Sequence, residues 1–365
     1  MKVKLLSSSF INAMNHWSII FFSALAASII FTLVVRRIAL RLEVVDWPDG
    51  QRKLHTNGRP LLGGVAIFGA FWLIVLILAQ TGSLPSPLLR HSLLGAFMGS
   101  IALLVVGIID DWRSLSPWIR LAAGALAVLI TLAAGVGLDK ITNPFGGVIN
   151  LGGWKLSLGP LGTIALLGDG LVFMWLMGMM YTTKVLDGLD GLATGIALVG
   201  TLMIFFLTMT KKFHQPEVGL LALALAGVLA GFLLFNFHPA RIFLGEAGSL
   251  LVGFLLGLLA VISGGKIATT LLVMAVPILD FLRVIVRRAW LGRSVFQGDR
   301  EHLHFRLLDA GFSERSTVLL LYALAFLFGI TTLFLQSAFK LLTLGFLAVL
   351  MLLVGFWLAR RPTRR

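Results

Sequence analysis

The chain has 365 residues and no cysteine; 58% of its residues are hydrophobic, only 13% are charged, and its mean hydropathy is +0.97. A soluble domain is typically about 25% charged, so this composition argues against an ordinary soluble protein and indicates a polytopic all-α membrane protein without disulfides or thiolate metal sites. The net charge of +14 would suit nucleic acid, but the basic residues stand between apolar segments, so we expect anionic headgroups and phosphate ligands as partners, and no nucleic acid.

The first predicted element is a membrane-spanning helix at residues 17–36. The chain begins with basic residues, and Ala24-Leu25-Ala26 resembles a signal-peptide cleavage site, so a cleaved signal is the alternative. The apolar run continues from Trp17 to Val35, about 19 residues, which is long enough to span a bilayer. We therefore expect a retained first helix.

Ten further apolar stretches have about the 20 residues that a spanning helix needs. The eleven predicted spans are 17–36, 62–80, 91–109, 118–136, 169–186, 191–209, 219–236, 247–263, 267–286, 316–336 and 340–359. With the N-terminus outside, 21 Lys and Arg residues fall on the inner side and 9 on the outer side, and 13 of 16 carboxylates also fall inside. The positive-inside rule then predicts an outer N-terminus and a cytoplasmic C-terminus, in one integral-membrane domain, 1–365.

The outer loop at residues 138–168 differs from the other outer loops. Gly146-Gly147, Gly152-Gly153 and Gly159-Pro160 punctuate short alternating runs such as Val148–Leu151. This pattern predicts a small β-hairpin element on the outer surface, although simple turns covering the helix ends remain the plainer interpretation.

The first inner loop is basic and rich in glycine and proline. Asp46-Trp47-Pro48 is followed by Arg52-Lys53-Leu54-His55 and then by Gly63-Gly64. The loop suits phosphate binding, and it equally suits the charge bias of an inner loop, so alone it decides neither.

Carboxylates at the ends of apolar stretches are the strongest functional signal. A carboxylate in mid-bilayer costs about 2.5–3.5 kcal/mol, so acidic residues in membrane segments usually mark a site. Asp110 and Asp111 end the third span, where the helix dipole disfavours negative charge, and adjacent helical residues point about 100° apart. We expect one to lie near a cation and the other to act as a base; the alternative is a solvated helix end paired with Arg113.

Asp187 and Asp190 are spaced i, i+3, which puts both on one face of a helix, with Gly188 and Gly191 leaving room for a ligand. Lys184 lies one turn upstream, and an ion pair with Asp187 is the structural alternative. Farther on, Asn236 offers an amide for a base or sugar, and Glu246 offers an oxygen ligand suited to Mg²⁺; an ordinary helix connection is the alternative.

The largest inner loop contains Asp299-Arg300-Glu301-His302-Leu303-His304-Phe305-Arg306. His302 and His304 share a face only where the backbone is extended, and with Arg300 beside them they suit diphosphate binding. A zinc site lacks a third ligand at suitable spacing, and a solvated basic loop is the alternative.

Taken in order, these elements resemble the polyprenyl-phosphate N-acetylhexosamine-1-phosphate transferases (glycosyltransferase family 4), more the WecA/TagO-like branch than the related MraY branch. The matching elements cover nearly the whole chain: Asp46-x-Pro48, Arg52-Lys53-x-His55, Gly63-Gly64, Asp110-Asp111, Asp187-Gly-Leu-Asp190-Gly, Asn236-x-x-Pro239-Ala240, Phe243-x-Gly245-Glu246-x-Gly248-Ser249 and Asp299-Arg300-Glu301-His302-x-His304.

The resemblance implies an Mg²⁺-dependent (or Mn²⁺-dependent) phosphotransferase. A polyprenyl phosphate, such as undecaprenyl phosphate, would attack the sugar-linked phosphate of a UDP-N-acetylhexosamine, with UDP-GlcNAc favoured, and release UMP as the first membrane step of a cell-envelope polysaccharide pathway. The implied setting is the cytoplasmic face of the inner cell membrane, with a homodimer as a candidate assembly. A transporter or flippase of lipid-linked sugars is the alternative, and it predicts carboxylates in mid-membrane and on both faces.

The resemblance also implies a role for each site residue. Asp110 and Asp111 would be catalytic, and Glu246 with Asp110 would bind the metal. The implied substrate-binding residues are Lys53, His55, Asp187, Asp190, Asn236, Arg300, His302 and His304.

Three departures from the family pattern stand out. Glu246 occupies a metal position that is usually Asp, Tyr181 and Lys184 replace the usual asparagines, and Phe305 follows His304 where WecA-like members commonly have a further histidine. A lysine at position 184 suits a phosphate contact or indicates altered nucleotide recognition.

Overall fold

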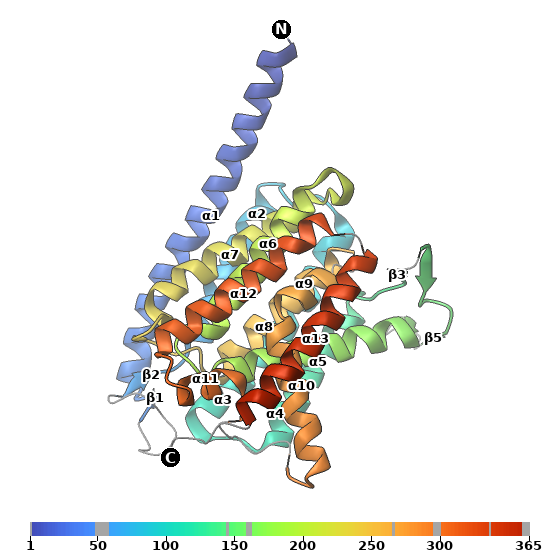
Figure 1. The fold of residues 1–365 in the computed structure, drawn as a ribbon. Helices are drawn as coiled ribbons and strands as arrows, with labels where there is room; N and C mark the ends of the chain where they lie inside the picture. Colours follow the sequence, from blue (N-terminus) through green and yellow to red (C-terminus); the bar gives the residue numbers. More distant parts are fainter. Residues whose placement is uncertain are drawn as a thin grey trace.

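The computed structural model describes residues 2–47, 58–143, 146–157, 163–264, 267–294, 301–335 and 337–359. These residues form a bundle of helices with three small sheets (Figure 1). The helices are α1 (Lys2–Arg41), α2 (Gly63–Gln80), α3 (Pro87–Arg113), α4 (Pro117–Ala133), α5 (Leu166–Leu186), α6 (Leu192–Met209), η2 (Lys211–Phe213), α7 (Pro216–Asn236), α8 (Gly245–Ile262), α9 (Ile267–Val273), α10 (Ala275–Trp290), α11 (Leu303–Asp309), α12 (Glu314–Phe334) and α13 (Ser337–Ala359).

The polytopic all-α character predicted from composition is confirmed. Within the described ranges, seven helices are long and apolar enough to cross a membrane, and the bent pair α9 and α10 would make an eighth span. The stretches Pro117–Ala133 and Ala338–Leu350 are also apolar but shorter. Each of the eleven predicted stretches coincides with a helix or a helix pair, whereas eleven crossings and an outer N-terminus stay predictions.

The ninth predicted stretch, residues 267–286, is not one straight helix. α9 and α10 meet at 78° around Met274. Pro277 stands in the first turn of α10 and has no N–H to donate to the carbonyl of Val273, so a continuous helix cannot form its regular hydrogen bond there. Asp280, which follows the break in α10, is buried.

Residue preferences at helix starts explain several boundaries. Proline occupies the first helical position of α3, α4 and α7, where its missing N–H costs nothing. The Ser86 hydroxyl accepts a hydrogen bond from the Leu89 N–H (3.3 Å) and caps α3. Ser313 caps α12 in the same way through the Ser316 N–H (3.2 Å).

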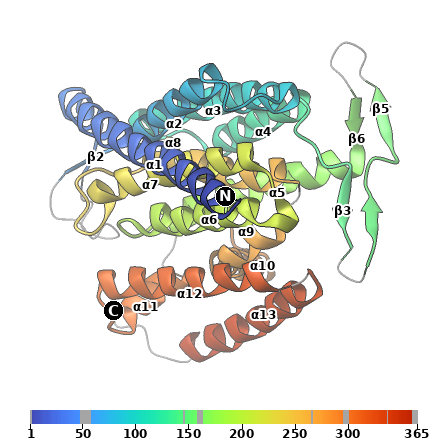
Figure 2. The ribbon, with the colours of Figure 1, turned by 90° about the horizontal axis from the view of Figure 1, so that it is seen from above.

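Three two-stranded antiparallel sheets join the helices. β1 (Val45–Asp46) pairs with β2 (Arg59–Pro60), β3 (Lys140–Thr142) with β4 (Val148–Asn150), and β5 (Lys155–Ser157) with β6 (Thr163–Ala165). The last two sheets stand beside the helical bundle (Figure 2) and occupy the segment where the alternating pattern predicts strands. The placement of these two sheets on the outer membrane surface stays a prediction.

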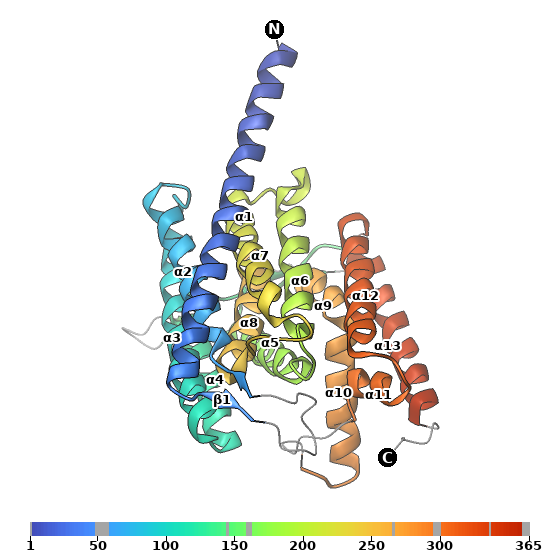
Figure 3. The ribbon, with the colours of Figure 1, turned by 90° about the vertical axis from the view of Figure 1, so that its left-hand side faces the viewer.

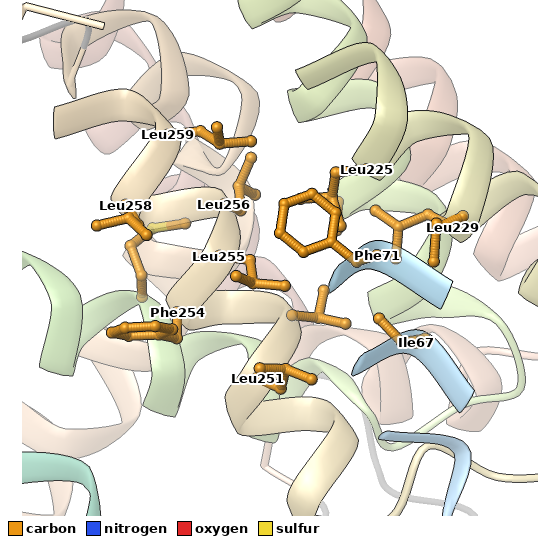
Figure 4. Packing of buried hydrophobic residues seen from close by; sticks show 14 of the residues in the cluster. Ile67, Phe71, Leu225, Leu229, Leu251, Phe254, Leu255, Leu256, Leu258 and Leu259 are labelled. Atoms are coloured by element: carbon orange, nitrogen blue, oxygen red, sulfur yellow. The ribbon is translucent and has the colours of Figure 1, made fainter. Parts of the chain in front are cut away.

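α8 lies at the centre of the bundle, in contact with α2, α3, α5, α6 and α7. Leu251 and Leu255 of α8 lie opposite Ile67 of α2 and Leu229 of α7 (Figure 4). Close helix approach depends on small residues: a Cβ on Gly107 of α3 would overlap the backbone of Ala247. This packing brings the acidic end of α3 against the first turn of α8.

Candidate active site

Asp111, in the last turn of α3, caps the start of α8. The Glu246 N–H donates a hydrogen bond to Asp111 Oδ1 (2.7 Å), and the residue at the N-cap of α8, Leu244, offers no side-chain acceptor. Gly245 has a φ of +72°, and a Cβ there would strike the Asp111 carboxylate. The unfavourable position of this carboxylate on α3 is therefore offset by the positive N-terminal end of α8.

The two adjacent aspartates have different partners, as their helical spacing predicts. Asp110 is buried, its Oδ1 accepts a hydrogen bond from the Leu115 N–H (2.5 Å), and the Arg120 Nε lies 3.7 Å from the same oxygen. Asp111 Oδ2, by contrast, is buried with no hydrogen-bond partner. Asp111 is thus held by one oxygen, while the other is available to a ligand.

The predicted metal ligand Glu246 is paired with the chain's own cations. The Lys184 ammonium donates a short hydrogen bond to Glu246 Oε1, and Arg120 Nη1 lies 3.8 Å from Oε2. Lys184 thus pairs with Glu246, across α5 and α8, and not with Asp187, the structural alternative considered from the sequence. Both predicted metal ligands, Asp110 and Glu246, therefore already face basic side chains.

Asp187 stands just after α5, among other carboxylates. Withdrawal of its side chain from bulk water raises its pKa well above the ordinary aspartate value, and the charges of Asp111, Asp190 and Glu246 raise it further. Because acidic groups gathered without enough counter-charge bind protons or cations more readily, Asp187 is a candidate cation ligand.

Asp190 connects three segments of the chain. Its Oδ2 accepts a hydrogen bond from the Ala240 N–H (2.9 Å) and lies 3.1 Å from His238 Nδ1, while its own N–H donates to Glu314 Oε1 (3.1 Å). Within the described ranges, Asp190, His238 and Glu314 are the set of three whose ligand atoms lie within 4.8 Å of one another. The imidazole Nδ1 is also 3.1 Å from Glu314 Oε2, so the histidine already bridges both carboxylates.

Asn236 is buried, and its amide is engaged inside the chain. Its Oδ1 accepts a hydrogen bond from the Thr194 hydroxyl (2.7 Å), and its Nδ2 donates to the Ile242 carbonyl (3.1 Å). In this conformation the side chain fixes the loop between α7 and α8 instead of presenting the predicted free amide to a substrate.

His302 and His304 do lie on one face. His302 precedes α11 with an extended backbone (φ −67°, ψ 149°), and the two rings stack with an interplanar angle of 3° and centroids 5.9 Å apart. Asp280 holds the pair in place: its Oδ2 lies 2.9 Å from His302 Nδ1, and its Oδ1 lies 2.7 Å from Arg283 Nη2.

His304 links the histidine loop to the aspartate run. A Cβ on Gly188 would lie 2.5 Å from His304 Nε2, so glycine at that position admits the ring. Burial, together with the charge of His302, lowers the pKa of His304 to about 3, and its Nε2 has no hydrogen-bond partner. A neutral imidazole with an unsatisfied nitrogen therefore lies directly beside the turn that carries Asp187.

Unsatisfied polar atoms concentrate around this cluster. Eight buried side-chain nitrogen and oxygen atoms in the described part of the chain lack a hydrogen-bond partner. Four of them are Asp111 Oδ2, Arg120 Nε, Tyr181 Oη and His304 Nε2. Because buried polar atoms are almost always paired, such a concentration indicates the place where a polar ligand binds.

Three predicted site residues, Lys53, His55 and Arg300, lie outside the described residues. The flank of the first inner loop is nevertheless positioned, because the Gly63 N–H donates to the Phe243 carbonyl (3.0 Å) and the Gly64 N–H donates to the Leu244 carbonyl (3.0 Å). The end of this loop, at the start of α2, therefore lies directly beside the start of α8.

Four residues of the site were not singled out by the sequence: Arg120, His238, Asp280 and Glu314. Asp280 and Arg283 form an i, i+3 acid–base pair inside an apolar stretch, which the rule for carboxylates in membrane segments would have marked. Arg120 lies in the first turn of α4, and nothing local distinguishes it from the other basic residues near the ends of the predicted spans.

Comparisons with known proteins agree with the resemblance. The model of the family described as glycosyl transferase family 4 matches residues 93–264, a range that contains both Asp110 and Glu246. A probable undecaprenyl-phosphate N-acetylglucosaminyl 1-phosphate transferase of Bacillus subtilis is 30% identical over 91% of this chain and 88% of its own length. A decaprenyl-phosphate N-acetylglucosaminephosphotransferase of Mycobacterium leprae is 32% identical over 80% and 76%. A phospho-N-acetylmuramoyl-pentapeptide-transferase of Moorella thermoacetica is 33% identical over 79% and 88%.

Proposed function

The chain belongs to glycosyl transferase family 4, and on this premise we propose that it transfers N-acetylhexosamine 1-phosphate from a UDP-N-acetylhexosamine to a polyprenyl phosphate. UDP-GlcNAc is the favoured donor and undecaprenyl phosphate the favoured acceptor, since related proteins carry names of that kind. UMP leaves, and the lipid-linked product starts a cell-envelope polysaccharide.

The observation that carries this proposal is the concentration of unsatisfied polar atoms among four carboxylates and two basic side chains. Phosphoryl transfer depends chiefly on positioning and charge neutralisation, which such a cluster supplies. An oxygen of the lipid phosphate would attack the sugar-linked phosphorus, and the bond from that phosphorus to the oxygen shared with UMP would break.

Each residue then has a part in the reaction. Asp111, held through Oδ1 by α8, presents its unpaired Oδ2 to the reacting phosphates, where it would help to hold a divalent cation. The Arg120 guanidinium and the stacked pair of His302 and His304 contact phosphate oxygens.

A divalent cation fits the cluster. Asp110 and Glu246 face two basic side chains, Arg120 and Lys184, and the carboxylates of Asp111 and Glu246 act on the neighbouring Asp187. With all four carboxylates ionised, the cluster carries four negative charges against two positive charges, an excess of two negative charges. Asp111 and Asp187, which lack a basic partner among the described contacts, would hold Mg²⁺ or Mn²⁺, and the ion would neutralise diphosphate charge when bound.

Exposed tryptophans support a location at a membrane surface. Trp47, Trp112, Trp118 and Trp290 are each at least 67% exposed and stand at the ends of β1, α3, α4 and α10 that lie at the same end of the bundle (Figure 3). Tryptophan is enriched at membrane–water interfaces. We place this end, with the site, at the cytoplasmic face of the inner membrane.

The test is UMP release by the purified full-length protein in detergent, with undecaprenyl phosphate, Mg²⁺ and a panel of UDP-N-acetylhexosamines. The proposal expects UMP that depends on both the lipid and the metal, fastest with UDP-GlcNAc. Folded protein that releases no UMP from any donor would contradict it and would favour the alternative, a transporter or flippase of lipid-linked sugars.

A further inference from the structure

Three residues that depart from the family pattern form one contact set. The Lys184 ammonium binds Glu246 Oε1 and lies 5.7 Å from the centre of the Tyr181 ring. These side chains come from α5 and α8, which pack together along the bundle. The departures are therefore one local arrangement and not three independent changes.

Two basic side chains contact the Glu246 carboxylate, one at each oxygen. Arg120 faces its second oxygen at 3.8 Å, so the carboxylate lies between two basic side chains. An ammonium has three donors, of which Glu246 accepts one, and the Lys184 side chain is 25% exposed. Lys184 is thus fixed in place and still accessible to a ligand.

The surroundings of Lys184 point to a phosphate as that ligand. Arg120 Nε and Tyr181 Oη, which flank the ion pair, are both buried hydrogen-bond donors without an acceptor. Phosphate oxygens are strong acceptors for such donors. A phosphate group bound beside the ion pair of Lys184 and Glu246 would give the unpaired Arg120 Nε an acceptor and would put its charge next to two fixed cations.

We propose that Lys184, fixed by Glu246 and assisted by Arg120, is a built-in cation that contacts the diphosphate of the nucleotide sugar, and that Glu246 is its anchor and not a metal ligand. This inference rests on the proposed function. It assigns divalent-ion binding to Asp111, whose Oδ2 is buried without a hydrogen-bond partner, and makes donor binding less dependent on metal than it would be if Glu246 were a ligand.

The first experiment measures UDP binding by calorimetry in EDTA, with the purified full-length protein and no lipid. Lys184→Met should weaken UDP binding about tenfold to a hundredfold, the contribution of one charge-assisted hydrogen bond, and should raise KM for the donor in UMP release. The matched control is Lys155→Met, which removes an exposed lysine whose partner is Asp139, outside the cluster. Equal binding by wild type and Lys184→Met would overturn the inference.

A double variant separates substrate contact from charge balance. If Lys184 only neutralises Glu246, then Lys184→Met/Glu246→Gln, which removes both charges, should recover the wild-type affinity for UDP. The inference predicts that the double variant binds UDP as weakly as Lys184→Met. Recovery would overturn the inference, and it would do so even where Lys184→Met alone is too unstable to purify.

Metal binding is measured in a separate experiment. Protein is titrated into Mn²⁺, and the electron paramagnetic resonance signal of the free ion reports how much Mn²⁺ stays unbound. Glu246→Gln should bind Mn²⁺ as wild type does, whereas Asp111→Asn should lose about tenfold or more in affinity, because it removes a charged ligand. Loss of Mn²⁺ binding in Glu246→Gln would identify Glu246 as a ligand and overturn the inference. Neither binding assay depends on turnover, so wild-type protein that releases no UMP would contradict the proposed function alone.

Discussion

Gly188→Ala should damage the site through a single added methyl group. The new Cβ would lie 2.5 Å from His304 Nε2 and 3.0 Å from Phe305 Cζ, whereas ordinary contacts begin at 3.4 Å. The His304 ring must therefore move by about 1 Å, and such overpacking typically costs about 1–3 kcal/mol. Since His304 stacks on His302, the displacement should reach both imidazoles.

The expected consequence for activity is larger than the consequence for stability. A misplacement of about 1 Å in a catalytic arrangement costs about a hundredfold in rate, and UMP release by the purified variant measures this loss. Gly178→Ala, in α5, is the matched control, because a Cβ there meets no heavy atom within 4 Å. Wild-type kcat/KM in Gly188→Ala would refute the inference that the aspartate run and the histidine loop form one site.

Three further predictions concern single side chains. Asp111→Asn should lower UMP release by at least about a hundredfold but leave the fold intact, because the amide oxygen still caps α8. Asp280→Asn should destabilise the protein by about 3–5 kcal/mol, the usual cost of breaking a buried ion pair, measured by thermal unfolding in detergent. His304 has a pKa of about 3 when folded against 6.5 when exposed, so the unfolded chain takes up the proton more readily. The stabilisation from its neutral form is complete above about pH 6.5 and is lost towards about pH 3, by about 1.4 kcal/mol per pH unit.

Each of these predictions has a control and a contradictory result. Asp139→Asn, at a side chain 69% exposed, should change neither activity nor stability. Turnover of Asp111→Asn at the wild-type rate would remove Asp111 from the chemistry, and an unchanged unfolding temperature in Asp280→Asn would show that its ion pair is unimportant. His304→Phe should lose less stability than wild type between neutral pH and about pH 5; equal slopes would contradict the pH argument.

The long helices were predictable because each contains an apolar stretch of about 20 residues. Their starts were not: the predicted spans begin at residues 91 and 219, whereas α3 and α7 begin at Pro87 and Pro216. The break between α9 and α10 was missed because hydropathy does not register the hydrogen bond that Pro277 cannot make. Hydropathy also does not separate stretches buried within the bundle from stretches that face lipid, because both are apolar.

The acidic residues of the site were predictable, but their partners were not. Lys184 and Glu246 are 62 positions apart in the chain, and Asp280 and His302 are 22 apart, so no local spacing indicates either pair. Helix periodicity did predict that Asp110 and Asp111 diverge. It could not show that Asp111 caps another helix, because that contact is created by the packing of α3 on α8.

The most direct test of the proposed reaction follows the sugar-linked phosphate itself. Wild-type protein in detergent would be incubated with undecaprenyl phosphate, Mg²⁺ and UDP-GlcNAc labelled at that phosphate, and the lipid fraction would be extracted. We predict that the label enters the lipid fraction in a one-to-one ratio with released UMP. Label that stays in the aqueous phase while UMP appears would show hydrolysis and would contradict the proposed transfer to lipid.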